Sequence, residues 1–305
     1  MQFQISIIIL HYNDANLTST FLDNLKKLNW HKISHHFIIV DNYSPDESGP
    51  ILESYYEYDP TVTVLLNKEN LGFAKGNNIG ICYAWENFHS DLIIVSNNDI
   101  KILDNDFPQS LLRSYYKGEY AVIGPDIYSL SKEIHQSPIR KKPLNREQLE
   151  LKIFHIDNTL HALYIIKKLH IYDLIRHIKR ILGKKPGTKG YQHKNPQEDV
   201  VLHGAFFILS RKYMEQYPDG LYNQTFLYME EDILAHRCRK KHLKTLYTPE
   251  LSVFHIDGYT TTKQTGNRCN KYIFELTETK KSCQIMLNMI QMENNNSNSS
   301  KELIL

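Results

Sequence analysis

The stretch Leu92-Ile93-Ile94-Val95-Ser96-Asn97-Asn98-Asp99-Ile100 decides the fold, because an apolar run of strand length ends in a polar cluster. Such a run predicts a buried strand of a largely parallel sheet. In open α/β sheets, ligands bind at the carboxyl ends of the strands. Asp99, flanked by the amides Asn97 and Asn98, would offer oxygen ligands to a divalent cation that carries phosphate. A strand followed by an ordinary Asn/Asp turn is the alternative interpretation.

The same pattern of an apolar run and a polar end recurs upstream. Apolar runs cover 5–10, 37–40 and 62–66, and polar residues follow each of them. Helical patterns over about 17–28 and 51–58, and a glycine-punctuated segment over 70–80 that leads into a helix to about 88, separate the runs. This alternation predicts an α/β fold with an open, mostly parallel twisted sheet and helices on both faces. Because parallel strands end at one edge, the loops at Asp41–Asn42, Asn67–Asn70 and Asn97–Asp99 are expected to share one crevice.

The second half of the chain continues this pattern after an interruption. A helix over 108–117 and a strand over 121–124 extend the first half, and α/β structure resumes at Val200. Further expected elements are strands over 206–209, 245–247 and 251–254, and helices over 230–241 and 272–292. The Asn- and Ser-rich tail 294–300 has the composition of a disordered segment. The chain therefore divides into 1–130, 131–200, 201–265 and 266–305.

The interruption is strongly basic. Residues 140–194 hold 14 Lys/Arg and 4 Asp/Glu, although the whole chain has a net charge of only +2. Apolar residues at helical spacing over 160–182 predict a basic amphipathic helix, followed by a loop at 183–187. Such a helix suits an anionic membrane surface. The alternative is a helix packed on the main domain with a solvated basic face.

Composition excludes several other classes of protein. The 305 residues are 41% hydrophobic, which is ordinary for a globular protein. No apolar stretch reaches 18 residues, and the N-terminus lacks the features of a secretory signal, so neither a membrane span nor secretion is expected. The four cysteines form no CxxC pair. Their spacing argues against a zinc site and favours free thiols in a reducing cytoplasm.

The segment 70–80, Asn-Leu-Gly-Phe-Ala-Lys-Gly-Asn-Asn-Ile-Gly, is the most distinctive in the chain. Its glycines permit tight turns and close backbone approach. Lys75 and the amides at the start of the following helix suit a phosphate group. The spacing matches neither a Walker A motif nor the GxGxxG of a dinucleotide-binding fold.

Together, these landmarks resemble those of family-2 glycosyltransferases. The matching stretches in the first half are 5–12, 40–44, 70–80 and 96–99, and the nearest likeness is to the rhamnosyltransferase-like branch that builds bacterial surface polysaccharides. The resemblance implies a GT-A fold in which 1–130 is the nucleotide-sugar-binding half. It implies that Asp41 contacts the nucleobase and that Asp99 binds a divalent metal on the diphosphate. Asn97 stands where the family's DxD motif has its first Asp.

The resemblance also implies which other residues contact the donor. Those expected to bind the nucleotide-sugar, in addition to Asp41, are Tyr12, Asn70, Gly72, Lys75, Gly76, Asn77, Asn97 and Asn98. The metal would be Mn²⁺ or Mg²⁺. The stretch 253–255 resembles the family's later metal site, which makes His255 a second expected metal ligand. His11 and His203 are expected to be structural.

Three consecutive acids carry the expected catalytic chemistry. The stretch 226–234 resembles the family's catalytic carboxylate motif, and 202–211 its acceptor-side strand, so 201–265 would be the acceptor half. A sugar hydroxyl is a poor nucleophile that needs a base. An ungapped match places that base at Glu231, a shift of one residue places it at Asp232, and Glu230 completes the cluster. Alternatively, these acids only complement the dipole of a helix N-terminus.

The sequence thus predicts an inverting glycosyltransferase. It would move a sugar from a UDP- or dTDP-sugar to a hydroxyl of a growing surface glycan, free or lipid-linked. We expect a cytoplasmic protein, peripheral on the inner face of the cytoplasmic membrane through residues 140–194, with no nucleic-acid partner. Two alternatives remain open here: a nucleotidyltransferase of related fold, and a non-catalytic adaptor that binds a membrane or nucleic acid through its basic segment.

Overall fold

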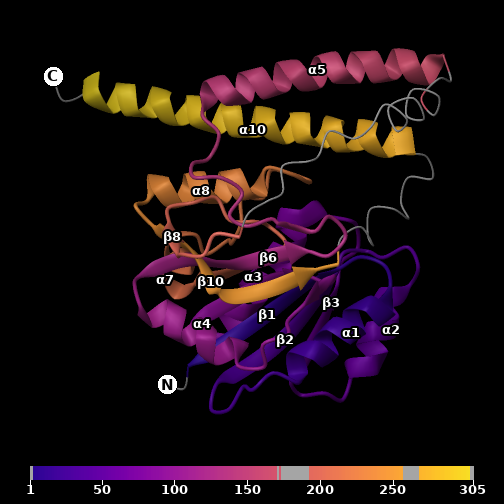
Figure 1. The fold of residues 1–305 in the computed structure, drawn as a ribbon, viewed down its shortest axis with the longest axis vertical. Coiled ribbons are helices and arrows are strands. Elements are labelled where there is room, and N and C mark those ends of the chain that lie inside the picture. Colours follow the sequence, from indigo (N-terminus) through magenta and orange to yellow (C-terminus); the bar gives the residue numbers. More distant parts are fainter. Residues whose placement is uncertain (1–2, 170–171, 173–191, 257–267, 303–305) are drawn as a thin grey trace. The chain divides into compact units, whose positions relative to one another are not determined.

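The computed structural model describes residues 3–169, 172, 192–256 and 268–302. The strands in this part of the chain form one ten-stranded sheet with helices on both of its faces (Figure 1). This mixed α/β architecture confirms the predicted fold class. The predicted loop at 183–187 and most of the predicted amphipathic helix over 160–182 lie outside the described residues.

The elements follow the predicted alternation closely. The strands are β1 (Gln4–His11), β2 (Ser34–Asp41), β3 (Val62–Leu66), β4 (Leu92–Asn97), β5 (Ile100–Lys101), β6 (Tyr120–Ser129), β7 (Ile134–His135), β8 (Gln197–Glu198), β9 (Phe206–Ser210) and β10 (Lys244–His255). The helices are α1 (Ala15–Lys26), α2 (Ser48–Tyr56), α3 (Gly72–Phe88), α4 (Phe107–Tyr116), α5 (Arg146–Lys168), α7 (Arg211–Gln216), α8 (Glu230–Lys240) and α10 (Arg268–Glu302).

β1 lies between β2 and β4, and these three strands run parallel. The strand order is β3-β2-β1-β4-β9-β6-β10-β5, with β7 paired to β6 and β8 paired to β10. β6 and β10 are also parallel, whereas β9 runs antiparallel to both of its neighbours, β4 and β6. The sheet is therefore parallel through its N-terminal strands, as predicted, and mixed beyond β4.

Alternate residues of the central strands face two different helix layers. On one face, Ile7 and Ile9 of β1 belong to a core with α1, α2 and α4 that includes Phe21. On the other face, Ile8 belongs to a core with α3, α7 and α8 that includes Ile81. All three β1 side chains are completely buried. Burial on both faces accounts for the uninterrupted apolar runs in the sequence.

Two elements differ from the sequence-based expectations. β10 is one strand over residues 244–255 with a register shift between Thr248 and Ser252, where the sequence showed two short apolar runs. α10 continues to Glu302 and so includes the stretch 294–300, where the composition predicted disorder. Once a helix has formed, each further residue adds a hydrogen bond at low cost, which lets it extend into residues of poor propensity.

The chain forms two compact units. The first comprises residues 1–143, 189–223 and 230–260 and contains the sheet; the second comprises 144–188, 224–229 and 261–305. In the second unit, α5 lies alongside α10 (Figure 1), and Lys280 pairs with Asp157 at 2.5 Å. None of the described helices carries an apolar stretch that would cross a bilayer. The four-part division expected from the sequence remains a prediction.

Candidate active site

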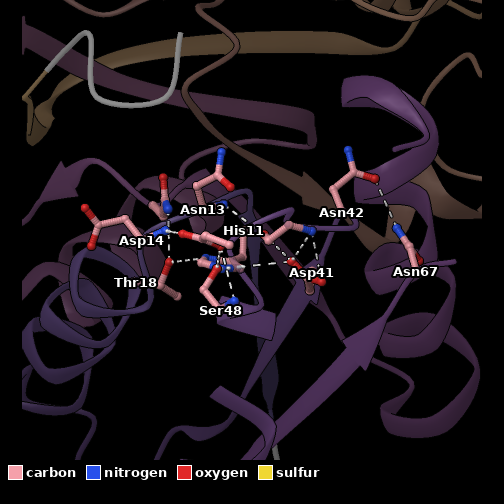
Figure 2. Close-up of polar contacts among 11 residues, drawn as sticks. His11, Asn13, Asp14, Thr18, Asp41, Asn42, Ser48 and Asn67 are labelled. Atoms are coloured by element: carbon pink, nitrogen blue, oxygen red, sulfur yellow. Dashed lines mark hydrogen bonds and ion pairs between the residues drawn. The ribbon is translucent and has the colours of Figure 1, made fainter. Parts of the chain in front are cut away.

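The strand register brings the predicted polar loops together. Leu10 pairs with Asn97 and His11 pairs with Asp41, so β1, β2 and β4 end at the same edge of the sheet. Asn67, which follows β3, donates its backbone N–H to the carbonyl of Asp41 at 2.9 Å. The loops after these strands therefore lie side by side, and Figure 2 shows polar residues of the loops after β1, β2 and β3 gathered at this edge.

Asp41 is a buried carboxylate wrapped by its own loop. The Ser44 backbone N–H donates to its two oxygens at 3.2 and 3.3 Å, and the Ser44 hydroxyl donates to Oδ1 at 2.5 Å. Gly49 of α2 packs so closely that a Cβ there would lie 2.3 Å from Asp41 Oδ2. The loop therefore fixes the orientation of the carboxylate that is predicted to contact a nucleobase.

We expect Gly49→Ala to weaken nucleotide binding, because the added methyl group must displace the Asp41 carboxylate. A shift of about 1 Å at a positioning group is expected to raise the Kd at least tenfold. Gly80→Ala is the matched control: its Cβ would lie 2.6 Å from Ile8 and 2.9 Å from Val40, and the Asp41 carboxylate is not among its three nearest contacts. It should lower the free energy of unfolding by about 1–3 kcal/mol without changing the Kd. Calorimetric titration and thermal unfolding measure both effects, and equal Kd values for the two variants would contradict this role of Asp41.

Asn42 joins the end of β2 to the start of α3. Its amide donates to Asn70 Oδ1 and to the Gly72 carbonyl, both at 3.0 Å, and its own oxygen accepts from the Leu71 N–H at 3.0 Å. Gly72 has a φ of 78°, in the left-handed region where glycine carries no steric penalty. An amide network thus holds the glycine-rich segment against the Asp41 loop. Sequence analysis did not assign this role to Asn42.

Lys75, Gly76 and Asn77 point in different directions from α3. A Cβ on Gly76 would lie 3.2 Å from the Asn42 side chain, so this glycine permits the close approach of the helix to the sheet. Asn77 is completely buried and donates to the Phe73 carbonyl at 3.0 Å. Lys75 is exposed and lines a surface pocket on the outer face of α3. Of the three, only Gly76 packs against the Asp41–Asn42 loop.

Asp99 and His255 meet where β5 pairs with β10. His255 Nε2 lies 3.2 Å from Asp99 Oδ1, and both residues are buried. His255 Nδ1 lies 2.9 Å from Gln136 Oε1. Because an amide oxygen only accepts, Nδ1 carries a proton, and a neutral ring would then direct the lone pair of Nε2 toward Asp99.

The Asp99–His255 pair fits a divalent cation. Asp99 Oδ1 is buried and accepts no hydrogen bond from the part of the chain that the structure describes. With the ring in this neutral form, two lone-pair atoms would lie 3.2 Å apart, and a cation placed between them would stabilise both. No group of three His, Cys, Asp or Glu side chains with metal-binding geometry occurs among the described residues. Diphosphate oxygens and water would therefore complete the coordination, as is usual for Mg²⁺.

The other residues predicted around Asp99 have different surroundings. Asn98 is buried and its amide donates to Thr18 Oγ1 at 3.0 Å, so its side chain is directed into the protein. The backbone N–H of Asn97 donates to the carbonyl of Ala205 at 2.9 Å. Tyr12 follows β1 directly and is half-buried at the same edge. Only Asn97 and Tyr12 of these predicted contacts remain partly exposed.

The three acids form the first turn of α8. Asp232 is buried and pairs with Arg140, whose Nη1 lies 2.6 and 2.5 Å from the two carboxylate oxygens. Glu231 Oε1 instead accepts the backbone N–H of Gly204 at 3.3 Å. Both carboxylate oxygens of Asp232 are thus engaged in the ion pair with Arg140, whereas Glu231 forms no such ion pair with the residues that the structure describes and can accept a proton. This geometry favours Glu231 over Asp232 as the base.

Burial shifts the proton affinity of both glutamates. Burial, together with the charge of Asp232, raises the pKa of Glu231. Burial and then the charge of Glu231 raise the pKa of Glu230 to about 8. Glu230 Oε1 has no hydrogen-bond partner among the described residues. A carboxyl group with a raised pKa is a stronger base once ionised, so the raised pKa of Glu231 suits a residue that takes up a proton.

The raised pKa of Glu230 predicts a pH-dependent stability. Its folded-state pKa of about 8 lies above the ordinary 4.5, so its contribution is fully present below pH 4.5 and is lost as the pH rises through 8. Glu230→Gln, which mimics the protonated form, should leave the unfolding midpoint unchanged at pH 4.5 and raise it at pH 8.5. Thermal unfolding at both pH values measures this difference. A variant that is less stable than the wild type at pH 8.5 would contradict it.

Sequence analysis missed two residues in the segment 134–140. Gln136 contacts His255 of the Asp99–His255 pair, and Arg140 pairs with Asp232. The segment reaches both because Ile139 and Arg140 are hydrogen-bonded to Val201. No local sequence pattern marks either residue. The only indication in the sequence was that an acid, if buried as Asp232 is, needs a basic partner such as Arg140.

A surface pocket lies beside the segment 134–140. Residues 134–139, His193 and His203 line it. The ring of His203 lies 6.0 Å from that of His255, and Gly204, the next residue, donates to Glu231. The pocket therefore adjoins both the Asp99–His255 pair and the candidate base, where a sugar and an acceptor hydroxyl would have to meet.

The fold and this edge of the sheet define a GT-A-type protein. The S. aureus TarS 1–349 structure in complex with UDP-GlcNAc is similar with a TM-score of 0.53 and 11% identity, over 86% of this chain and 61% of that one. The TarS 1–349 complex with UDP is similar with a TM-score of 0.52 and 11% identity, over 85% and 61%.

Sequence comparison gives the family. Residues 6–217 match the profile described as "Glycosyl transferase family 2", and the chain belongs to that family. A curated relative is the "Low-salt glycan biosynthesis hexosyltransferase Agl10" of Haloferax volcanii, which is 25% identical over 242 residues. The match covers 78% of this chain and 62% of the relative, so the chain spans about three fifths of the relative's length.

Proposed function

We propose that this protein is an inverting glycosyltransferase that moves one sugar from a nucleotide diphosphate donor to a hydroxyl group. The observation that carries the proposal is that two consecutive residues link the two groups: His203 lies beside His255 of the Asp99–His255 pair, and Gly204 donates to the Glu231 carboxylate. Membership of glycosyltransferase family 2 supports it.

The proposed reaction is a single displacement. The acceptor hydroxyl oxygen attacks the anomeric carbon while the bond from that carbon to the diphosphate oxygen breaks. Glu231 takes the hydroxyl proton, and the nucleoside diphosphate leaves with the bonding electron pair. One displacement inverts the anomeric configuration. A cation held by Asp99 and His255 would supply counter-charge for the leaving diphosphate.

The donor is proposed to be a UDP- or dTDP-sugar. The Asp41 carboxylate, oriented by Ser44 and Gly49, would accept from the N–H of a pyrimidine base. The segment 70–80, tied to Asn42, would border the nucleotide. The similarity to a TarS structure that holds UDP-GlcNAc supports a uracil nucleotide.

The acceptor is proposed to be a growing surface glycan, free or lipid-linked. The relative's name, a hexosyltransferase of glycan biosynthesis, supports a glycan acceptor. The 14 Lys/Arg of residues 140–194 suit an anionic membrane surface. We therefore propose a cytoplasmic protein that acts as a peripheral protein on the inner face of the membrane.

A donor panel tests the proposal. UDP-, dTDP- and GDP-sugars are incubated with the protein, Mn²⁺ and a lipid extract, and the release of nucleoside diphosphate and the mass of the product are measured. We expect release with at least one donor and none above background with Glu231→Gln. Release that is equal in the two proteins, or absent across the panel, would contradict the proposal. Calorimetry that finds no binding of UDP with Mn²⁺ would favour a non-catalytic adaptor instead.

A further inference from the structure

His11 occupies the end of the central strand, between the Asp41 loop and the Asp99 loop. It is completely buried, and both of its ring nitrogens have hydrogen-bond partners. Nδ1 lies 2.6 Å from Thr18 Oγ1, and Nε2 lies 2.7 Å from Ser48 Oγ (Figure 2). Nothing in the proposed reaction uses this residue, although it lies 3.9 Å from Asp41.

The partners determine the direction of each hydrogen bond. Ser48 donates its only hydroxyl proton to Asp46 Oδ1 at 2.5 Å, so Ser48 must accept from His11 Nε2–H. A neutral ring then accepts at Nδ1, and Thr18 is the donor. Thr18 Oγ1 in turn accepts from the Asn98 amide at 3.0 Å. One directed chain therefore runs from Asn98 through Thr18, His11 and Ser48 to Asp46.

The charge state of His11 agrees with this direction. Burial lowers the pKa of His11, although the carboxylates of Asp41, Asp46 and Asp14 act in the opposite direction. A protonated ring would present N–H groups to both hydroxyls and would require Thr18 to give up its role as donor. The neutral ring with its proton on Nε2 is the form that satisfies every partner.

This series of hydrogen bonds connects the loop that contains Asp99 with the loop that follows Asp41. At one end, Asn98 precedes the metal residue Asp99. At the other end, Asp46 lies in the loop that wraps Asp41, and Ser48 is the first residue of α2 that follows this loop. One further hydrogen bond holds Asp46 in place, because the backbone N–H of Asp14 donates to Asp46 Oδ2 at 2.9 Å.

We propose that His11 is a positioning residue that holds the nucleobase loop and the metal loop in one fixed arrangement, so that the base and the diphosphate of a donor bind as a single rigid unit. This inference rests on the proposed function, since it assumes a nucleotide donor. It differs from a packing role because each ring nitrogen serves a different loop. Cutting one bond should therefore weaken one part of the donor site and spare the other.

Two substitutions of His11 separate the two bonds. The amide of His11→Asn reaches only as far as Nδ1, so it keeps the bond to Thr18 and loses the bond to Ser48. The amide of His11→Gln reaches Nε2, so it keeps Ser48 and loses Thr18. Ser48→Ala removes the bond to Ser48 and Thr18→Val removes the bond to Thr18, while His11 stays in place. These two variants allow the same comparison if a His11 variant does not fold.

Calorimetry with two probes reads the two loops separately. UMP without metal reports the nucleobase loop, and pyrophosphate with Mn²⁺ reports the metal loop. We expect His11→Asn and Ser48→Ala to raise the Kd of UMP on the order of tenfold while sparing pyrophosphate. His11→Gln and Thr18→Val should raise the Kd of pyrophosphate with Mn²⁺ on the order of tenfold while sparing UMP.

The outcomes distinguish this inference from the proposed function. If every variant weakens both probes equally, weakens neither, or shows the reverse selectivity, His11 does not position the loops in this way and the inference is overturned. If the wild-type protein binds neither probe, the proposed nucleotide donor is wrong and the inference falls with it.

Discussion

Glu231→Gln should lower the turnover number by about 10²–10⁴-fold, because the acceptor hydroxyl loses its general base. The substitution keeps the size of the side chain and leaves an amide oxygen to accept the Gly204 N–H that Glu231 Oε1 accepts at 3.3 Å. The Kd of the donor nucleotide should therefore not change. Steady-state kinetics for turnover and calorimetry for binding measure the two quantities.

Asp232→Asn is the matched control for that prediction. It removes the ion pair with Arg140, so we expect the free energy of unfolding to fall by about 1–3 kcal/mol, with a smaller loss of turnover than in Glu231→Gln. A thermal unfolding scan beside the kinetic assay separates these effects. If Asp232→Asn loses turnover completely and Glu231→Gln retains it, the base is Asp232.

Asp99→Asn should abolish the metal dependence of the reaction. The substitution removes the charge whose Oδ1 lies 3.2 Å from His255 Nε2, and with it an anionic ligand of the cation. Lewis-acid stabilisation of a leaving group is worth several kcal/mol, so we expect kcat/KM to fall by about 10²-fold or more. Titration of activity with Mn²⁺ measures the change.

Gln136→Ala should have a smaller effect on the metal dependence than Asp99→Asn. It leaves both proposed ligands in place and removes only the acceptor 2.9 Å from His255 Nδ1. Loss of such an outer partner typically weakens metal affinity by about 10–100-fold. We therefore expect Gln136→Ala to need more Mn²⁺ for half-maximal activity and to recover at saturation. An unchanged Mn²⁺ requirement in both variants would show that the metal lies elsewhere.

The fold was predictable because its determinants are local. Apolar runs buried on both faces mark the parallel strands, and the polar residues that follow them mark one edge of the sheet. The register of β1 with β2 and β4 then brings Asp41 and Asn97 to that edge. The sequence predicted a strand over 206–209, which is β9, but it did not predict that this strand lies antiparallel between β4 and β6.

The contacts within the candidate site were less predictable, because they join distant residues. Arg140 meets Asp232 across 92 positions, and Gln136 meets His255 across 119. No periodicity or spacing encodes such pairs. The sequence also did not predict the direction in which each side chain points. Asn98 and Asp99 are neighbours in the sequence, yet the Asn98 amide donates a hydrogen bond inward to Thr18. His11 was expected to be structural, and its partners are what suggest a positioning role.

The stereochemistry of transfer tests the central claim most directly. A UDP-α-sugar that the protein turns over is incubated with Mn²⁺ and without acceptor, and proton NMR records the anomer released to water before it equilibrates. A single displacement assisted by Glu231 predicts that the β-anomer appears first and that Glu231→Gln releases it about 10²–10⁴-fold more slowly. First release of the α-anomer, or release that does not depend on Glu231, would contradict the account.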